Sequence, residues 1–157
     1  AGRDGAETTP GPSNMAVVPV EVWETLTSTT IERKFLLPDT GGAGASRGGL
    51  GQEVVIRNDS QHPMTVFCMA NRTDFPALGL LGGAAGRLRE HRLNGVTVDP
   101  KGHYELAPGD RITMIEAGGG GYGDPGQRSR AAIEADLAEG FITPEGAVRD
   151  YGVDINE

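Results

Sequence analysis

The chain has 157 residues, a usual length for one domain with a single hydrophobic core. Its 14 Lys and Arg against 22 Asp and Glu give a formal net charge of −8. This charge argues against a nucleic-acid partner, because a phosphate backbone needs a basic surface, and no apolar run approaches the roughly 20 residues that span a bilayer. Glycine stands out with 25 residues, about twice the average share.

The N-terminal part is predicted to hold an extended arm and two strands. Residues 1–14 are rich in Gly, Pro, Thr and Asn, which is typical of an arm rather than a packed element. Two strands are predicted within 15–37, because apolar residues alternate along both: Val18, Val20 and Val22, then Ile31, Phe35 and Leu37.

Two further strands are predicted after a glycine-rich loop over 38–51, which has no helix or strand propensity of its own. They cover 53–58 and 64–70, and Asn, Asp, Ser and Pro between them predict a turn. The strand over 64–70 is apolar on both faces, so we expect it to be central and covered on both sides.

The next part of the chain predicts an irregular segment over 71–95 and then short strands near 96–98, 103–106 and 111–116. Pro and Gly within Ala107–Asp110 stand where a type II turn needs them. A second glycine-rich loop follows over 117–127.

The C-terminus changes to a helical period. A helix over about 128–140, with Gly140 as its C-cap, is predicted by three apolar residues spaced by four: Ile133, Leu137 and Phe141. A second helix should follow Thr143 as N-cap, with Pro144 at its first position, and end at Gly152.

These elements together predict a mainly β (α+β) fold. We expect a β-sandwich or distorted barrel with long glycine-rich loops, closed by two short C-terminal helices. The β domain should cover 15–127, and the helical segment over 128–157 should belong to the same domain.

Cys68 is the single cysteine of the chain. A lone cysteine forms no internal disulfide, which favours a reducing compartment, and the first residues are polar and acidic, unlike a signal peptide. We therefore expect a cytoplasmic protein. Cys68 lies in an apolar run without a basic or His neighbour, so it should be a small buried side chain rather than a reactive thiol.

The run Gly118–Gly123 satisfies the pattern GxGxxG, but its context argues against a dinucleotide site. That motif should open a helix in a βαβ unit, whereas Pro125 and Gly126 intervene here and the region 20 residues later is itself helical. A tight turn from the last strand into the closing helices is the plainer interpretation.

A second interpretation of this loop is close approach of its backbone to a ligand or a partner. Glycine permits such an approach, and the candidates in the loop are Gly119, Gly120, Gly121, Tyr122 and Asp124. Ordinary packing for the tyrosine and a helix-entry cap for the aspartate are the alternatives.

Asp39 and Arg47 are the charged candidates of the first glycine-rich loop. The loop lacks the pattern GxxxxGK[ST] of a phosphate-binding loop. Arg47 could clamp a carboxylate or phosphate, or it could bridge backbone carbonyls or a nearby carboxylate, for which Asp39 is the obvious partner.

The sequence holds no visible catalytic or metal-binding cluster. His62, His91 and His103 stand next to turn residues without the spacing of metal ligands, so we expect all three to be exposed to solvent. A GxSxG nucleophile pattern is missing as well. These observations argue against an enzyme that works by itself.

Several strings resemble the C-terminal region of the hydantoinase B and acetone carboxylase α family, in the order found there. They are Gly2–Gly5, Pro19–Val22, Leu37–Gly44, Arg47–Gly51, Leu93–Gly95, Pro108–Asp110, Gly119–Pro125 and Ala147–Val153. Each string alone is modest, but together they span nearly the whole chain. Ser46 departs from the family, in which an aromatic residue commonly precedes the arginine of the first loop.

The resemblance implies a small, non-catalytic subunit of an ATP-dependent ketone carboxylase. Family members are long single chains, so this chain would complete a split B-type subunit, an organisation similar to that of acetophenone carboxylase. The implied partners are a hydantoinase A-type subunit that binds ATP and a larger B-type subunit, in a hetero-oligomer. ATP and a divalent metal are implied for the complex, and no cofactor for this chain alone.

Two alternatives stay open from the sequence. One is a subunit of an ATP-dependent hydrolase of hydantoins, 5-oxoproline or related lactams, because the substrate pocket should lie elsewhere. The other is an independent β-sandwich module whose glycine-rich loops bind a small anion or sugar.

Overall fold

The structure, a computed structural model, describes residues 2–6 and 18–153. Most of the predicted arm over 1–14 therefore lies outside the described residues. The predicted boundaries at 15–127 and 128–157 stay predictions.

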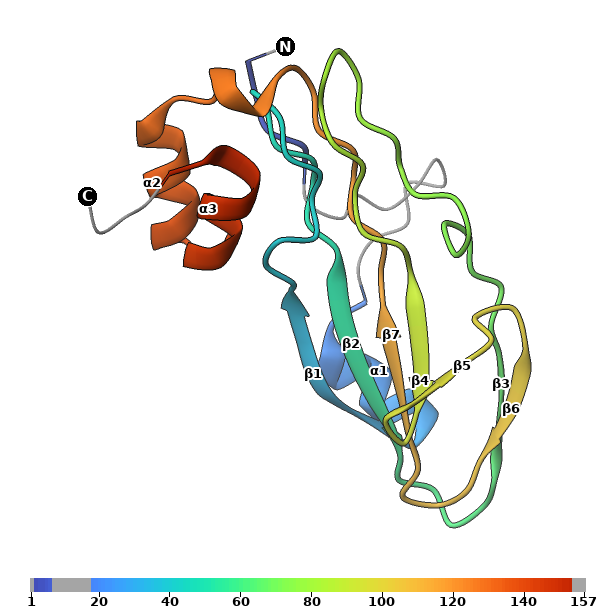
Figure 1. The fold of residues 1–157 in the computed structure, drawn as a ribbon. Helices are drawn as coiled ribbons and strands as arrows, with labels where there is room; N and C mark the ends of the chain where they lie inside the picture. Colours follow the sequence, from blue (N-terminus) through green and yellow to red (C-terminus); the bar gives the residue numbers. More distant parts are fainter. Residues whose placement is uncertain (1, 7–17, 154–157) are drawn as a thin grey trace.

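The described chain forms two antiparallel sheets and a pair of C-terminal helices (Figure 1). The larger sheet has the strand order β1 (Thr29–Leu36), β2 (Gln52–Asn58), β7 (Arg111–Ile115), β4 (Glu90–Leu93) and β5 (Val96–Val98). The smaller sheet pairs β3 (Met64–Phe67) with β6 (His103–Leu106). This mainly β fold with two closing helices is the predicted one, and its described strands form no closed barrel.

The main hydrophobic core lies between the two sheets. Ile112 of β7 and Leu106 of β6 are each 2% exposed, and Cys68, just after β3, is buried with them. Ile56 and Leu93 stand opposite Ile112 in the strand register and extend the same apolar face. The prediction of a buried cysteine is confirmed, and burial raises the pKa of its thiol.

The prediction that the strand over 64–70 is central is wrong. β3 belongs to the two-stranded sheet, so only one of its faces meets the core. Phe67 is 73% exposed on the other face, and Met69 beyond the strand is 90% exposed. The apolar residues of β3 therefore pack against the core on one face and are exposed to solvent on the other.

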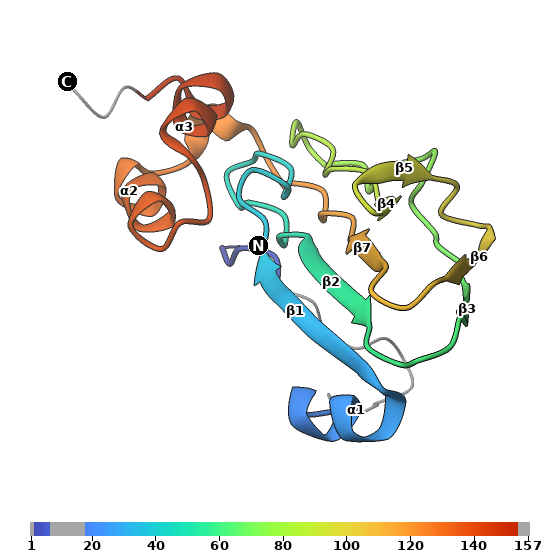
Figure 2. The same cartoon turned by 90° about the horizontal axis from the view of Figure 1, so that it is seen from below.

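A helix, α1 (Val20–Thr27), replaces the first predicted strand. The alternating valines favour a strand, but contacts with β1 favour a helix and outweigh that preference. Trp23 Nε1 donates to Thr29 Oγ1 at 3.0 Å, and Glu24 Oε1 accepts the backbone N–H of Ile31 at 2.8 Å. α1 consequently lies beside the start of β1 (Figure 2).

Strand β4 lies inside the segment that the sequence predicts to be irregular. It pairs with β5 through the turn at Asn94 and Gly95, which both have positive φ. The other short strands agree with prediction, and so does the turn before β7, in which Gly109 has φ of 86° and Asp110 N donates to Ala107 O at 3.0 Å.

The closing helices are α2 (Arg130–Ala138) and α3 (Pro144–Tyr151), after a short 3₁₀ turn, η1 (Pro125–Gln127). The predicted caps of α3 are confirmed, because Thr143 Oγ1 accepts the N–H of Gly146 at 2.9 Å and Gly152 ends the helix with φ of 67°. A second, small core lies between these helices, built on Ile133, Ile142 and Ala147. None of the described helices is long and apolar enough to cross a membrane.

Candidate functional site

Three glycine-rich segments run side by side beyond the upper end of the larger sheet, and the helices lie to one side of them (Figure 1). We call residues 40–49, 77–87 and 117–123 the glycine core. Its segments are joined by backbone hydrogen bonds. The middle segment, 117–123, bonds to both neighbours: Gly119 N donates to Gly49 O at 2.8 Å, and Gly121 N donates to Ala84 O at 2.9 Å. This segment is thus extended and central rather than a tight turn.

At several glycines the segments approach so closely that a side chain would have no room. A Cβ atom on Gly48 would lie 2.1 Å from Gly119 O, one on Gly120 would lie 2.2 Å from Leu78 O, and one on Gly121 would lie 2.0 Å from Ala43 O. Real Cβ atoms essentially never come within 3.0 Å of a heavy atom. Close backbone packing therefore explains the clustering of glycine, and the backbone approached is the chain's own.

Tyr122 and Asp124 follow this central segment. Tyr122 exchanges two backbone hydrogen bonds with Ser46, each 2.9 Å long, and its side chain is partly exposed. Asp124 Oδ1 accepts the N–H of Gly126 at 2.9 Å and caps η1. These contacts support the helix-entry cap, which the sequence offered as the alternative to a ligand contact for Asp124.

Asp39 holds α3 against the glycine core. Its Oδ1 accepts the backbone N–H of Thr143 at 2.9 Å, and its Oδ2 accepts the Thr143 hydroxyl at 2.6 Å. The residue has φ of 58°, which aspartate tolerates better than most residues do. Asp39 was considered from the sequence as a partner of Arg47, but its carboxylate bonds to Thr143, and Asp136 of α2 is a carboxylate that reaches the arginine.

Arg47 is 3% exposed and stands at the junction of the glycine core with the helices. Its Nε donates to Asp136 Oδ2 at 3.2 Å, and its Nη1 donates to Gly48 O at 2.7 Å. The guanidinium also lies over the Phe141 ring, 5.1 Å from the ring centre. A bridge to a backbone carbonyl and a carboxylate is thus observed, as considered from the sequence.

Arg47 belongs to a four-residue ion cluster, together with Asp4, Arg128 and Asp136. Arg128 Nη2 donates to Asp136 Oδ2 at 2.6 Å and to Asp4 Oδ2 at 2.9 Å, while Arg128 Nη1 donates to Asp4 Oδ1 at 2.7 Å. Asp4 Oδ1 also accepts the backbone N–H of Arg47 at 2.7 Å. The cluster therefore ties the N-terminal residues, the glycine core and α2 together.

The electrostatics of the ion cluster follow from these contacts. The hydrogen bond from Arg128 lowers the pKa of Asp4. Burial alone would lower the pKa of Arg128, but its hydrogen bond to Asp4 and the charge of Asp136 outweigh burial and raise that pKa. Burial also raises the pKa of Tyr151, whose ring centre lies 5.8 Å from the Arg128 guanidinium carbon. Each of the four charged side chains thus forms an ion pair with an opposite charge of the same cluster.

The sequence prediction missed Asp4, Arg128 and Asp136. One signal was available for Asp136, because it follows Ile133 by three residues and so places a charge on the apolar stripe of α2. Nothing in the sequence pairs Asp4 with Arg128 across 124 positions. That contact exists only in the folded chain.

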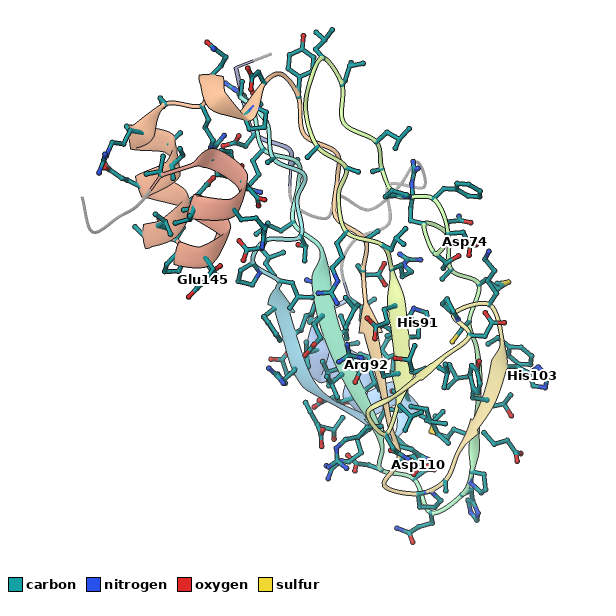
Figure 3. All side chains as sticks on the ribbon, in the orientation of Figure 1. Asp74, His91, Arg92, His103, Asp110 and Glu145 are labelled. Carbon is teal, nitrogen blue, oxygen red and sulfur yellow. The ribbon has the colours of Figure 1, made fainter. Side chains whose placement is uncertain are left out.

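His91 differs from the prediction of three exposed histidines. It lies on β4 and is buried, and neither ring nitrogen has a hydrogen-bond partner among the described residues. Burial and the charge of Arg89 lower its pKa. Figure 3 shows His91 inside the molecule and His103 at the outer margin, where it stacks on Phe67 at 5.9 Å between ring centres.

A cavity of about 290 Å³ opens between α1 and the two sheets. Its walls carry no charged residue and include Trp23, Ile56, Met64, Val66, Leu106 and Met114. This composition suits an apolar group, and the polar residues of the wall, Thr27, Thr29 and Asn58, use their side chains in hydrogen bonds within the chain.

No group of three or more His, Cys, Asp or Glu in 2–6 and 18–153 is placed to hold a metal. The N–H groups of Gly118, Gly119 and Gly121, which a phosphate would need, already donate to carbonyl groups of this chain.

Comparison with known proteins places the chain in a family. The family described as Hydantoinase B/oxoprolinase matches residues 1–125. The beta subunit of caprolactamase from Pseudomonas jessenii is 33% identical over 150 residues, which cover 87% of this chain and 25% of that protein. The B subunit of a putative D-/L-hydantoinase from Pseudomonas sp. strain NS671 is 27% identical over 148 residues, covering 88% and 24%.

Two solved structures share the fold. The crystal structure of the ATP-dependent caprolactamase from Pseudomonas jessenii matches with a TM-score of 0.73 and 28% identity, covering 88% of this chain and 26% of that one. A nucleotide-free acetone carboxylase matches with a TM-score of 0.67 over 87% and 23%. Its identity of 20% shows a likeness of fold alone.

The chain thus spans about a quarter of the length of these relatives. The family match nevertheless covers most of this chain, in the same region where the glycine core is built. The protein therefore belongs to the Hydantoinase B/oxoprolinase family.

Proposed function

We propose that this chain is part of the B-type subunit of an ATP-dependent enzyme that opens a cyclic amide. The observation that carries the proposal is its double likeness to caprolactamase, at 33% sequence identity with the beta subunit and a TM-score of 0.73 with the solved structure. The likeness to the hydantoinase supports the same substrate class, because a hydantoin also contains a ring amide.

The role proposed for this chain is structural. Asp39 docks α3, Arg47 bridges the glycine core to α2, and Asp124 caps η1, so each charged candidate already serves the fold. The catalytic groups, the ATP site and the divalent metal would then belong to the rest of the complex. We expect an A-type ATP-binding subunit and the remainder of a B-type subunit as partners, in the cytoplasm.

Ketone carboxylation, the activity that the sequence resemblance implies first, is the second candidate. It is favoured by the likeness to acetone carboxylase, which shares the fold with a TM-score of 0.67. It ranks below amide hydrolysis because that match has 20% identity, against 28% for the caprolactamase structure.

The test is to isolate the tagged chain with its partners from its source cells and to assay the complex. Caprolactam and hydantoin with ATP, and acetone and acetophenone with ATP and bicarbonate, would be compared by ADP release and substrate loss. We expect ATP-dependent loss of a cyclic amide by the complex and none by the chain alone. Turnover by the chain alone, or a folded monomer that binds a small anion without partners, would contradict the proposal.

A further inference from the structure

One edge of the molecule carries large apolar side chains that the described chain leaves uncovered. They follow β3 and the segment that runs from β3 to the upper end of the molecule (Figure 1). We call them the apolar flank, and their exposed fractions run from 62% to 90%: Phe67, Met69, Phe75, Leu78, Leu80 and Leu81.

The apolar flank has the composition of a protein interface. Between Pro63 and Gly86 the only charged residues are Arg72 and Asp74, and depletion of charge marks the centre of protein–protein interfaces. A large exposed apolar patch is also rare on a monomer. The strand pattern points the same way, because residues 64–70 are apolar on both faces but meet a core on one face only.

The backbone beneath the leucines is held in place before any partner binds. Leu80 N donates to Gly121 O at 2.9 Å, and Ala84 N donates to Ala43 O at 2.7 Å. The three leucines of the flank are therefore presented from the hydrogen-bonded glycine core, with their side chains exposed. A surface ordered in advance loses less entropy on binding.

Leu81 provides an independent sign of a partner. The turn from Leu80 to Gly83 closes with a 3.1 Å hydrogen bond, and its two central residues have positive φ, 52° at Leu81 and 94° at Gly82. Such turns favour Asn-Gly, which the β4–β5 hairpin of this same chain uses at Asn94 and Gly95. A leucine in this conformation is unfavourable, and in the described chain its side chain is mostly exposed.

We infer that the apolar flank is the contact surface for the remainder of the B-type subunit, with Leu81 as a specificity-determining contact. Length argues for this occupant, because the chain spans 25% of the caprolactamase beta subunit and so leaves three quarters of such a subunit to supply a covering surface. The inference rests on the proposed function and adds to it the surface that the partner covers.

Substitution of Leu81 by Asn should change the stability of the chain and its binding to the partner in opposite directions. Asn suits the left-handed conformation, so Leu81→Asn should raise the Tm of the isolated chain by about 2–4 °C. The same substitution should lower recovery of the Hydantoinase B-family partner about tenfold, since burial of a leucine side chain contributes on this scale. The matched control is Val148→Asp on α3, an exposed apolar residue away from the flank, which should leave recovery unchanged.

The measurement is purification of the tagged full chain from its source cells, with the partner identified by peptide sequencing and quantified. A photo-crosslinking amino acid at position 78 should join the chain to the Hydantoinase B-family partner, and the same probe at position 148 should not. The crosslink needs no change in stability, so it stands even where the Leu81→Asn chain folds poorly.

Three results would overturn the inference. Equal recovery of the partner by the wild type and Leu81→Asn, with crosslinks from position 148 only, would move the contact elsewhere and leave the proposed function intact. Crosslinks from position 78 to a second copy of this chain, or to a protein of another family, would assign the flank to that occupant. Purification without any Hydantoinase B-family chain would reject the proposed function itself.

Discussion

At the scale of single residues, the charged contacts of the ion cluster connect parts of the chain that are distant in the sequence. Two arginines and two aspartates share hydrogen bonds of 2.6–3.2 Å, and three of these four side chains are buried. A buried charge is costly without its partner, so removal of one member leaves the others poorly compensated. The cluster is therefore the place where single substitutions should have large effects.

Asp4→Asn tests the hold on the N-terminal residues. The amide keeps the shape but loses the charge that Arg128 binds, so we expect a loss of about 1–2 kcal/mol in the free energy of unfolding, discounted for the partial exposure of Asp4. Urea denaturation at pH 7 measures it. Asp74→Asn is the matched control, because its pair with Lys101 is exposed to solvent and its loss should change the free energy of unfolding little.

The same substitution predicts a pH dependence. The folded pKa of Asp4 is below its ordinary value of about 3.9, so the folded state holds the proton more weakly than the unfolded state does. The advantage of the wild type over Asp4→Asn should be complete above about pH 5 and vanish as the pH falls through the folded pKa. A constant difference from pH 7 down to pH 2 would contradict this account.

His91→Leu should stabilise the isolated chain. Two buried ring nitrogens without described partners cost free energy, so an apolar replacement should gain about 1 kcal/mol at pH 7. Burial lowers the folded pKa of His91, so below about pH 6.5 the unfolded state takes up the proton first and the wild type loses stability.

The gap between His91→Leu and the wild type should therefore widen from pH 7 to pH 5 in thermal unfolding. His62→Gln is the control, because the His62 side chain is exposed and its replacement relieves no burial. A gap that narrows toward pH 5 would show that His91 gains a proton and a partner in the folded chain.

At the scale of elements, the glycine core is held together by its backbone rather than by apolar side chains. Its segments are held by backbone hydrogen bonds, and the missing side chains allow carbonyl oxygens to approach within about 2 Å of where a Cβ would stand. The arrangement has little tolerance, because a Cβ added at one of the closely packed glycines would push two segments apart.

Gly121→Ala should accordingly cost at least about 3 kcal/mol or prevent folding, since its Cβ would overlap Ala43 O. Gly140→Ala is the comparison: its φ is 72° but no atom lies within 4 Å of the added Cβ. That variant should cost only about 1 kcal/mol, for the left-handed conformation. Thermal unfolding of both variants measures the two losses of stability. Equal losses would show that close packing is not the reason for glycine at position 121.

At the scale of the whole molecule, the ion cluster connects the parts of the chain that hold two separate hydrophobic cores. One core lies between the sheets around Ile112, and the other lies between α2 and α3 around Ile133. The second core is too small to be stable by itself. Its stability therefore depends on the connection that Arg47 and Arg128 make to Asp136.

Arg128→Met should uncouple the two cores. We expect one cooperative unfolding transition in the wild type and two in the variant, the helical segment melting first. Scanning calorimetry together with helix-sensitive circular dichroism would show the early transition. Arg130→Met is the control, because the pair that Arg130 makes with Glu134 is exposed, and this variant should keep a single transition. A single transition in both variants would reject the two-core account.

The sequence by itself determined the features that depend on local chemistry. The caps of α3 at Thr143 and Gly152, the turn at Gly109, most of the short strands and the family resemblance all follow from residue type and spacing. The Asn94–Gly95 hairpin carried the same kind of local signal, although β4 was predicted to be irregular.

Only the tertiary structure decided the features that depend on distant partners. Contacts with β1 make Val20–Thr27 a helix, and burial on β4 hides His91. Asp4 meets Arg128 across 124 positions, and glycines of three separate segments pack backbone against backbone. Residue type and spacing report local preference and periodicity, whereas the position of a strand in a sheet and the partner of a charge are set by contacts that form only when the chain folds.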